Sequence, residues 1–287
     1  MSITRQAVAA ALLITTFGIA ACSRSDEATK APPKDPEPAQ RKPSESLAVK
    51  PTDGKPMDSE GFVASVPPKI TGSFADGEAA YQAKKYADAT AIFESYTERR
   101  PANPWGHYML GLSAWKSGDL SKSEQAFEKA LSIDPHHVKS LVNLSRVFID
   151  QKRHDEAVDR LTRASEIEPE SGEVHRLLGR TYYTQRKTDE AVAAYRQAID
   201  LDERDAWSMN NLGLLLLETE RADEALPLLT SAVELRKDVP EFHNNLGMAL
   251  EHTRQFKAAA TAYGEALAVD PNYDKAKQNL ARVEAIK

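Results

Sequence analysis

Apolar and polar positions alternate with a helical period from about residue 70 to the end of the chain. Apolar residues recur there at spacings of three and four, and short polar runs interrupt them at regular intervals. This pattern predicts amphipathic helices joined by short turns. The first 69 residues differ, because an uncharged apolar stretch is followed by a proline-rich segment without helical period. The chain therefore divides into an N-terminal leader, a linker and a helical part.

The helical part repeats itself every 34 residues, which indicates an array of similar helix pairs. Small residues occupy positions 8, 20 and 27 of the repeats, except for Tyr96 at position 27 of the first, and a bulky residue occupies position 24, so the two helices of a pair should approach closely. A recurring glycine inside a helix costs about 1 kcal/mol against alanine and implies such an approach. Position 8 is occupied by Gly77, Gly111, Ser145, Gly179, Gly213 and Gly247. Position 24 is occupied by Phe93, Phe127, Leu161, Tyr195, Leu229 and Tyr263.

These repeats resemble the tetratricopeptide repeat (TPR), although none keeps the family's tryptophan at position 4. The resemblance implies an all-α, right-handed superhelical solenoid of six TPR helix pairs and a C-terminal capping helix. The expected repeats are 70–103, 104–137, 138–171, 172–205, 206–239 and 240–273, and the capping helix is 274–287.

The apolar stretch from Ala7 to Ala21 is too short for a permanent transmembrane helix, since fifteen helical residues reach about 22 Å of a roughly 30 Å hydrocarbon core. It ends in Ile19-Ala20-Ala21-Cys22, which resembles the lipobox of bacterial lipoproteins. The resemblance implies that residues 1–21 are a signal peptide and that Cys22 becomes a lipid anchor. An ordinary signal peptide with a chance cysteine is the alternative.

The residue after Cys22 bears on the cellular location. By family analogy, Ser23 differs from the aspartate that retains lipoproteins in the inner membrane. We therefore expect an envelope protein that is lipid-anchored at the outer membrane and faces the periplasm, if the organism has two membranes.

Residues 22–69 comprise Cys22 and a linker that contains nine of the sixteen prolines, with charges of both signs. Such a composition buries too little apolar surface to offset the entropy of ordering, so we expect a disordered spacer. A segment that docks on the cell wall or on a partner is the alternative.

The family resemblance implies that positions 2, 5, 6, 9, 12 and 13 of the first helices line a concave groove. Asparagines recur there, and each offers a donor and an acceptor to a peptide backbone. Position 6 holds Asn143, Asn211, Asn245 and Asn279, and position 5 holds Asn210 and Asn244. The alternative is that these asparagines only support local repeat structure.

Basic and aromatic residues lie beside the asparagines at other groove positions. Arg146, Arg176 and Arg180 suit the recognition of carboxylates through paired hydrogen bonds, so the partner segment is expected to carry acidic groups. The aromatic residues are either interface anchors or packing between repeats. They are Phe74, Tyr81, Trp105, Tyr108, Trp115, Tyr183 and Trp207.

Catalytic and metal-binding patterns are missing from the sequence, and we expect neither an enzyme nor a cofactor. Three histidines, His107, His175 and His243, share position 4 but lie in different repeats. The net charge of -6 argues against nucleic acid as a partner. We therefore predict a membrane-anchored scaffold that binds a protein or peptide segment and assists envelope assembly in a pilotin-like or adaptor-like manner. The alternative is a non-catalytic subunit of a glycosyltransferase or peptidoglycan-processing complex. The sequence does not indicate an oligomeric state.

Overall fold

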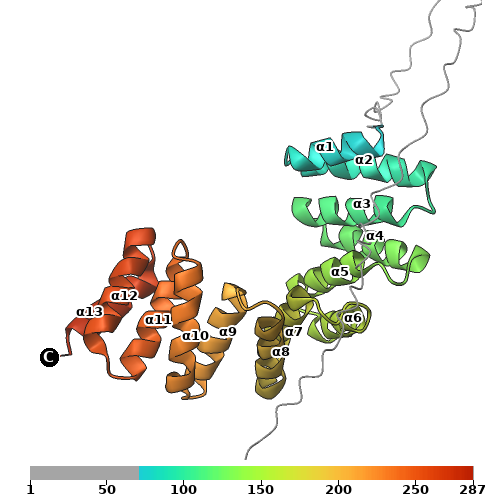
Figure 1. Ribbon diagram of the computed structural model, residues 1–287. Helices are drawn as coiled ribbons and strands as arrows, with labels where there is room; N and C mark the ends of the chain where they lie inside the picture. Colours follow the sequence, from blue (N-terminus) through green and yellow to red (C-terminus); the bar gives the residue numbers. More distant parts are fainter. Residues whose placement is uncertain (1–70, 287) are drawn as a thin grey trace, which may run out of the picture. The chain divides into compact units, whose positions relative to one another are not determined.

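The computed structural model describes residues 71–286, and these residues form thirteen α-helices and no strand (Figure 1). The all-α repeat fold predicted from the sequence is confirmed. The signal peptide, Cys22 and the linker lie outside the described residues. The helices are α1 (Phe74–Gln82), α2 (Tyr86–Arg99), α3 (Pro104–Ser117), α4 (Leu120–Ile133), α5 (Val138–Asp150), α6 (His154–Ile167), α7 (Gly172–Thr184), α8 (Thr188–Leu201), α9 (Ala206–Glu218), α10 (Ala222–Leu235), α11 (Pro240–His252), α12 (Phe256–Val269) and α13 (Asp274–Glu284).

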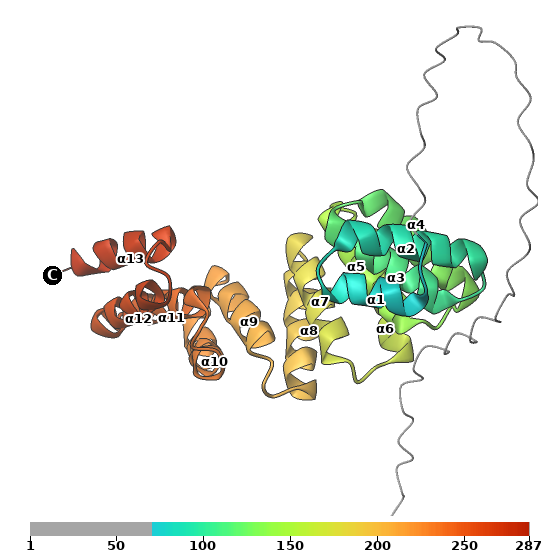
Figure 2. The ribbon, with the colours of Figure 1, turned by 90° about the horizontal axis from the view of Figure 1, so that it is seen from above.

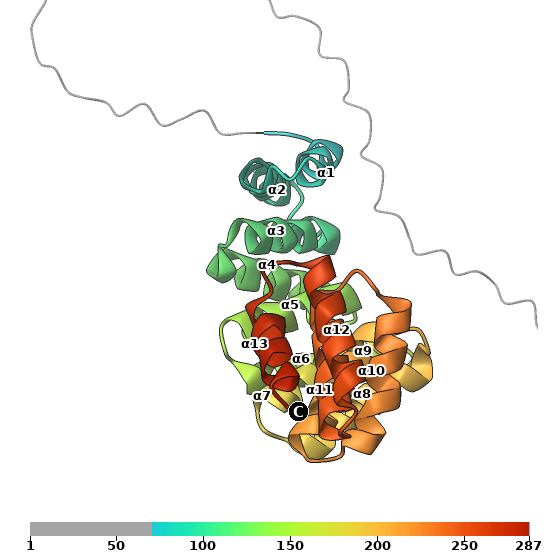
Figure 3. The same ribbon diagram turned by 90° about the vertical axis from the view of Figure 1, so that its left-hand side faces the viewer.

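Helices that are consecutive in sequence are neighbours in space, so the array is built from local contacts (Figures 1 and 2). Each odd-numbered helix packs on the even-numbered helix that follows it, and each pair packs on the next. The first helices of neighbouring repeats also contact each other, as α7 does α9 and α9 does α11. The terminal helix α13 lies against both α11 and α12 (Figure 3). The first helices and α13 therefore share one continuous surface.

Glycine at position 8 allows the two helices of a pair to touch. A Cβ atom added to Gly179 would lie 2.7 Å from the Tyr195 ring, and one added to Gly247 would lie 2.5 Å from the Tyr263 ring. Carbon atoms in contact are normally about 3.5–4.0 Å apart, so no side chain fits there. The close approach predicted from the recurring glycines is thus observed.

The turn inside every repeat has a left-handed residue at position 15. Gly118 has a φ of 90°. At the other five turns the same position is occupied by a residue with a side chain, and the following N–H closes the helix end, as Arg153 N donates to the Phe148 carbonyl at 2.8 Å. These residues are Lys84, Lys152, Arg186, Glu220 and Arg254, with φ between 59° and 62°.

The position-4 histidines fasten one repeat to the next. His107 Nε2 lies 3.0 Å from the Pro101 carbonyl oxygen, and His243 Nε2 lies 2.9 Å from that of Lys237. Because a carbonyl only accepts, Nε2 must carry the proton in these contacts. His175 makes the same contact at 3.1 Å. These histidines therefore hold the turn between repeats, consistent with position 4 being a packing site.

Candidate functional site

A pocket of about 430 Å³, the N-terminal pocket, opens on the surface formed by α1, α3, α5 and the start of α7. Ten of its lining residues occupy groove positions predicted from the repeat register. Its lining residues are Tyr81, Tyr108, Leu112, Trp115, Lys116, Val138, Lys139, Val142, Asn143, Arg146, Glu168, Ser171 and Glu173. The register therefore located this surface, although Leu112 and Lys116 were not singled out from the sequence.

The aromatic side chains of the N-terminal pocket are fixed by contacts within and between repeats. Trp115 Nε1 donates a hydrogen bond of 2.7 Å to the Asp150 carboxylate in the next repeat. The Tyr108 ring lies edge-on to Trp105, with centroids 5.7 Å apart, and burial raises the pKa of its hydroxyl. Both rings remain only partly buried. A hydrogen bond to the next repeat thus holds Trp115, and packing within α3 holds Tyr108, while one side of each ring faces the pocket.

Charge on the N-terminal pocket is partly neutralised within the protein. Arg146 forms an ion pair with Glu173 and donates a hydrogen bond of 3.2 Å to the Asn143 side chain. The Lys116 ammonium lies 4.4 Å from the centre of the Trp115 ring, which is within cation–π range. Neither Lys116 nor Lys139 pairs with a carboxylate among residues 71–286. These two lysines are the available cations of this pocket.

A second groove pocket of about 370 Å³, the central pocket, lies between α7, α8 and α9. Trp207 and Tyr183 are 45% and 36% exposed, and both face it. Arg180 is exposed and has no carboxylate partner in the described part of the chain. The lining residues are Arg180, Tyr183, Thr184, Tyr195, Trp207, Asn211 and Leu214.

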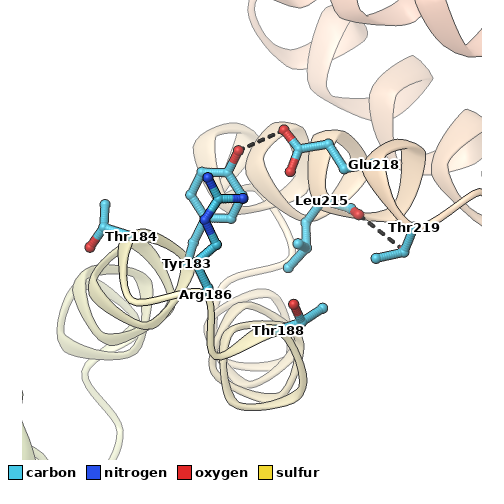
Figure 4. Close-up of a pocket in the computed structure, with 7 residues that line it drawn as sticks. All are labelled: Tyr183, Thr184, Arg186, Thr188, Leu215, Glu218 and Thr219. Carbon is cyan, nitrogen blue, oxygen red and sulfur yellow. Dashed lines mark hydrogen bonds between the residues drawn. The ribbon is translucent and has the colours of Figure 1, made fainter.

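Tyr183 also borders an adjoining pocket of about 460 Å³, drawn in Figure 4. Its hydroxyl donates a hydrogen bond of 2.6 Å to Glu218 Oε1 in the next repeat. This hydrogen bond, followed by burial, raises the pKa of Tyr183 to about 12. Tyr183 is therefore held in one orientation as the shared wall of two pockets.

Arg176 has a partner inside the protein. It lies 2.7 Å from the Asp205 carboxylate, whose side chain is almost fully buried. Asp205 also caps α9 by accepting from Ser208 N at 3.2 Å and from Ser208 Oγ at 2.6 Å. Arg176 thus supplies the charge that the buried Asp205 needs, and it ties α7 to the N-cap of α9.

Five of the six predicted asparagines form one hydrogen-bonded chain, the asparagine chain. Asn279 donates to Asn244 and Asn245 donates to Asn210, each at 2.9 Å. Shorter-range contacts complete it, from Asn244 to Asn245 at 3.3 Å and from Asn210 to Asn211 at 3.4 Å. The chain links α13, α11 and α9, and Asn244 is only 2% exposed. Asn211 is the last residue of the asparagine chain, and it lines the central pocket.

Asn143 lies apart from this chain. Its Nδ2 donates to the Lys139 carbonyl in its own helix at 2.8 Å. The predicted asparagine ladder therefore separates into two groups: Asn143 and Asn211 line pockets, whereas the remaining asparagines bond across repeats.

Family models described as "Tetratricopeptide repeat" match residues 114–181 and 210–279, and one described as "TPR repeat" matches residues 182–220. Together these matches cover more than half of the 287 residues without a break. The chain is a tetratricopeptide repeat protein. No curated protein matches this TPR protein.

Several solved structures are similar to this TPR protein. PilF of Pseudomonas aeruginosa aligns with a TM-score of 0.65 at 18% identity, over 72% of this chain and 95% of PilF. YrrB, described as "a TPR protein with an unusual peptide-binding site", aligns with a TM-score of 0.53 at 18% identity, over 65% of this chain and 96% of YrrB. MamA aligns with a TM-score of 0.52 at 22% identity, over 58% of this chain and 97% of MamA. At these identities the likeness shows the shared fold.

Within 71–286 there is no group of three His, Cys, Asp or Glu side chains placed to hold a metal ion. None of the thirteen helices is both long and apolar enough to cross a membrane.

Proposed function

We propose that this TPR protein is a lipid-anchored, non-catalytic scaffold of the bacterial envelope that binds a segment of another protein in the groove of its first helices. The N-terminal pocket carries the proposal, because it brings aromatic rings, unpaired lysines and an asparagine amide together at groove positions. Aromatic residues and cations of this kind are frequent interface anchors. The peptide-binding site named for YrrB supports a peptide ligand for the same fold.

The binding mode follows from the chemistry of the pocket. The exposed sides of Tyr108 and Trp115 offer flat apolar surface, on which an apolar side chain of the partner packs. Lys116 and Lys139 attract carboxylates at the rim, where salt screens the attraction. The spare donor and acceptor capacity of the Asn143 amide suits a peptide group of the bound segment.

Site-specific photocrosslinking in the cells that produce the protein tests this function. A photoreactive phenylalanine analogue replaces Lys116, which is exposed at the N-terminal pocket. The same analogue replaces Arg196 as the matched control, because Arg196 is an exposed cation on a second helix, α8. We expect a discrete adduct from position 116 and none from position 196. Equal adduct patterns, or none from position 116, would contradict groove binding. An adduct with a wall synthase or hydrolase would identify the protein as a subunit of that complex.

The proposed anchor is tested separately. Cys22→Ala should move the protein from the membrane fraction to the soluble fraction, since acyl chains contribute about 0.8 kcal/mol for each buried methylene. Ser23→Asp is the companion variant and should move it from the outer to the inner membrane. Retention of the Cys22→Ala protein in the membrane would refute lipid anchoring and leave groove binding untouched.

A further inference from the structure

We propose that the central pocket is a specificity subsite for an aspartate or glutamate side chain of the bound segment, with Arg180 as the group that recognises it. The inference rests on the proposed function, because it names the partner chemistry of the same groove. It concerns a pocket separate from the N-terminal pocket, so the two can fail independently.

The three groove arginines differ in their partners. Arg146 is paired with Glu173, and Arg176 is paired with the buried Asp205. Arg180 lies one turn after Arg176 on α7 and has no carboxylate partner within residues 71–286. Its guanidinium is therefore free to form paired hydrogen bonds with an incoming carboxylate.

The wall of the central pocket is positively charged. Arg180 is the sole ionised residue among those that line the central pocket. The lining hydroxyl of Tyr195 stays neutral, because burial raises its pKa. Thr184, Asn211 and the remaining lining residues are uncharged. The wall thus carries one net positive charge, which an acidic side chain complements.

Glu218, an acidic residue of the neighbouring repeat, does not line the central pocket. Glu218 accepts a 2.6 Å hydrogen bond from the Tyr183 hydroxyl and lies in the adjoining pocket (Figure 4). This bond fixes both the carboxylate and the Tyr183 ring that separates the two pockets. The Arg180 side of that ring is left for a ligand.

The apolar part of the central pocket is formed by aromatic rings that are held in place. Trp207 is 45% exposed, yet its ring packs edge-on against the buried Phe242, with centroids 4.9 Å apart. Trp207 and Tyr183 are therefore exposed but already held in place. They lose little side-chain entropy when a ligand binds, which favours binding. The expected ligand carries a large apolar or aromatic residue close to its aspartate or glutamate.

A peptide selection tests the proposal. A synthetic library of short random peptides, acetylated and amidated so that terminal charges are absent, is bound to the purified full chain in detergent. We expect enrichment of Asp or Glu beside an aromatic residue. Arg180→Ala should lower the affinity for the enriched peptides about ten- to hundred-fold, since a hydrogen-bonded charge pair is lost. Arg180→Lys should restore part of the affinity, and Arg196→Ala should change nothing.

The other outcomes separate the two proposals. Peptides without acidic enrichment, or peptides that bind Arg180→Ala as well as wild type, overturn the subsite. If those peptides instead depend on Tyr108, groove binding stands without the subsite. If no peptide binds, both proposals fail. Thermal unfolding of each variant checks folding, and Arg180→Ala should unfold like wild type because the side chain it removes is exposed.

Discussion

The two ends of the groove use the same repeat positions for different purposes. Near the N-terminus, Asn143 at position 6 lines an aromatic pocket and bonds within its own helix. Near the C-terminus, Asn245 at position 6 donates to Asn210 at position 5 of the preceding repeat. The corresponding position-5 residue before Asn143 is Tyr108, whose hydroxyl interacts with the Asn143 side chain but carries no second polar group through which the chain could continue. Whether a groove asparagine is available to a ligand is therefore decided by its neighbour in the adjacent repeat.

The largest expected effect comes from placing a charge in the asparagine chain. Asn244→Asp would bury a carboxylate and remove the donor that contacts Asn245. We expect the free energy of unfolding to fall by about 3 kcal/mol. Urea denaturation followed by circular dichroism measures it.

The matched variant for this prediction is Asn143→Asp at the other end of the groove. It should cost clearly less, because the Arg146 guanidinium already lies 3.2 Å from the Asn143 oxygen and compensates a new charge. Equal losses from both variants would show that the two ends of the groove do not differ in this way.

The next effect concerns ligand binding at the N-terminal end. Tyr108→Ala should weaken binding of the captured partner by about 2 kcal/mol in binding free energy, as expected for an aromatic interface anchor. Asn245→Ala, in the asparagine chain, should lower stability and leave partner affinity unchanged. Isothermal titration with the partner identified by crosslinking gives both affinities. A comparable loss of affinity in Asn245→Ala would place the ligand on the C-terminal asparagines instead.

A smaller effect is the pH dependence of stability at the N-terminal end of the groove. His137 is the N-cap of α5, and its Nδ1 accepts from Ser140 N at 3.2 Å. Burial, the largest cause, lowers the pKa of His137 in the folded protein. The unfolded chain then binds the proton more readily, so this contribution to stability is present above about pH 6.5 and is lost as the pH falls below it.

Loss of the cap should cost about 1 kcal/mol, because a protonated ring cannot accept the hydrogen bond. His137→Asn keeps a capping acceptor and should reduce the loss of stability between pH 7 and pH 5. The neighbouring exposed His136→Asn serves as control. Denaturation midpoints at several pH values measure the effect, and identical pH profiles for wild type and His137→Asn would exclude this role.

The smallest effect uses the left-handed turns. Gly118→Ala should cost about 1 kcal/mol, because a side chain at positive φ is strained. An added Cβ meets no atom within 4 Å, so packing adds nothing to this cost. Lys152→Gly should stabilise by up to about 0.5 kcal/mol, since relief of strain exceeds the added freedom of the unfolded chain. Thermal unfolding compares the two variants. A stabilising Gly118→Ala would contradict the left-handed conformation of this turn.

The sequence predicted the fold because the information for each helix pair is local. First helices begin at Pro104, Val138, Gly172, Ala206 and Pro240, the residues from which the repeats were counted. The contact between a small residue and a bulky residue inside each pair, glycine with an aromatic ring in four of the six, was likewise visible as a pattern at positions 8 and 24. Register alone also placed Asn143 and Arg146 on a shared surface with Tyr108 and Trp115.

Partners across repeats were not predicted, because they depend on the rotation between neighbouring repeats. The structure shows a recurring offset of 35 residues, as in Trp115 with Asp150 and Tyr183 with Glu218. In these two pairs a donor ring at position 12 meets a carboxylate at position 13 of the next repeat. The pairing of Arg176 with Asp205 similarly distinguished it from the free Arg180. The turns inside the repeats were predicted, but their left-handed conformation was not, because only Gly118 carries a glycine there.

The asparagine chain has a consequence for how the array moves. It ties α9, α11 and α13 together through side chains that are largely shielded from water. Removing one member leaves its neighbours with unsatisfied amides, so these helices should open together and not one by one. In hydrogen–deuterium exchange, their backbone amides should therefore lose protection with a single opening free energy. The helices before α9 lack this chain. Each helix pair there should therefore exchange with an opening free energy of its own.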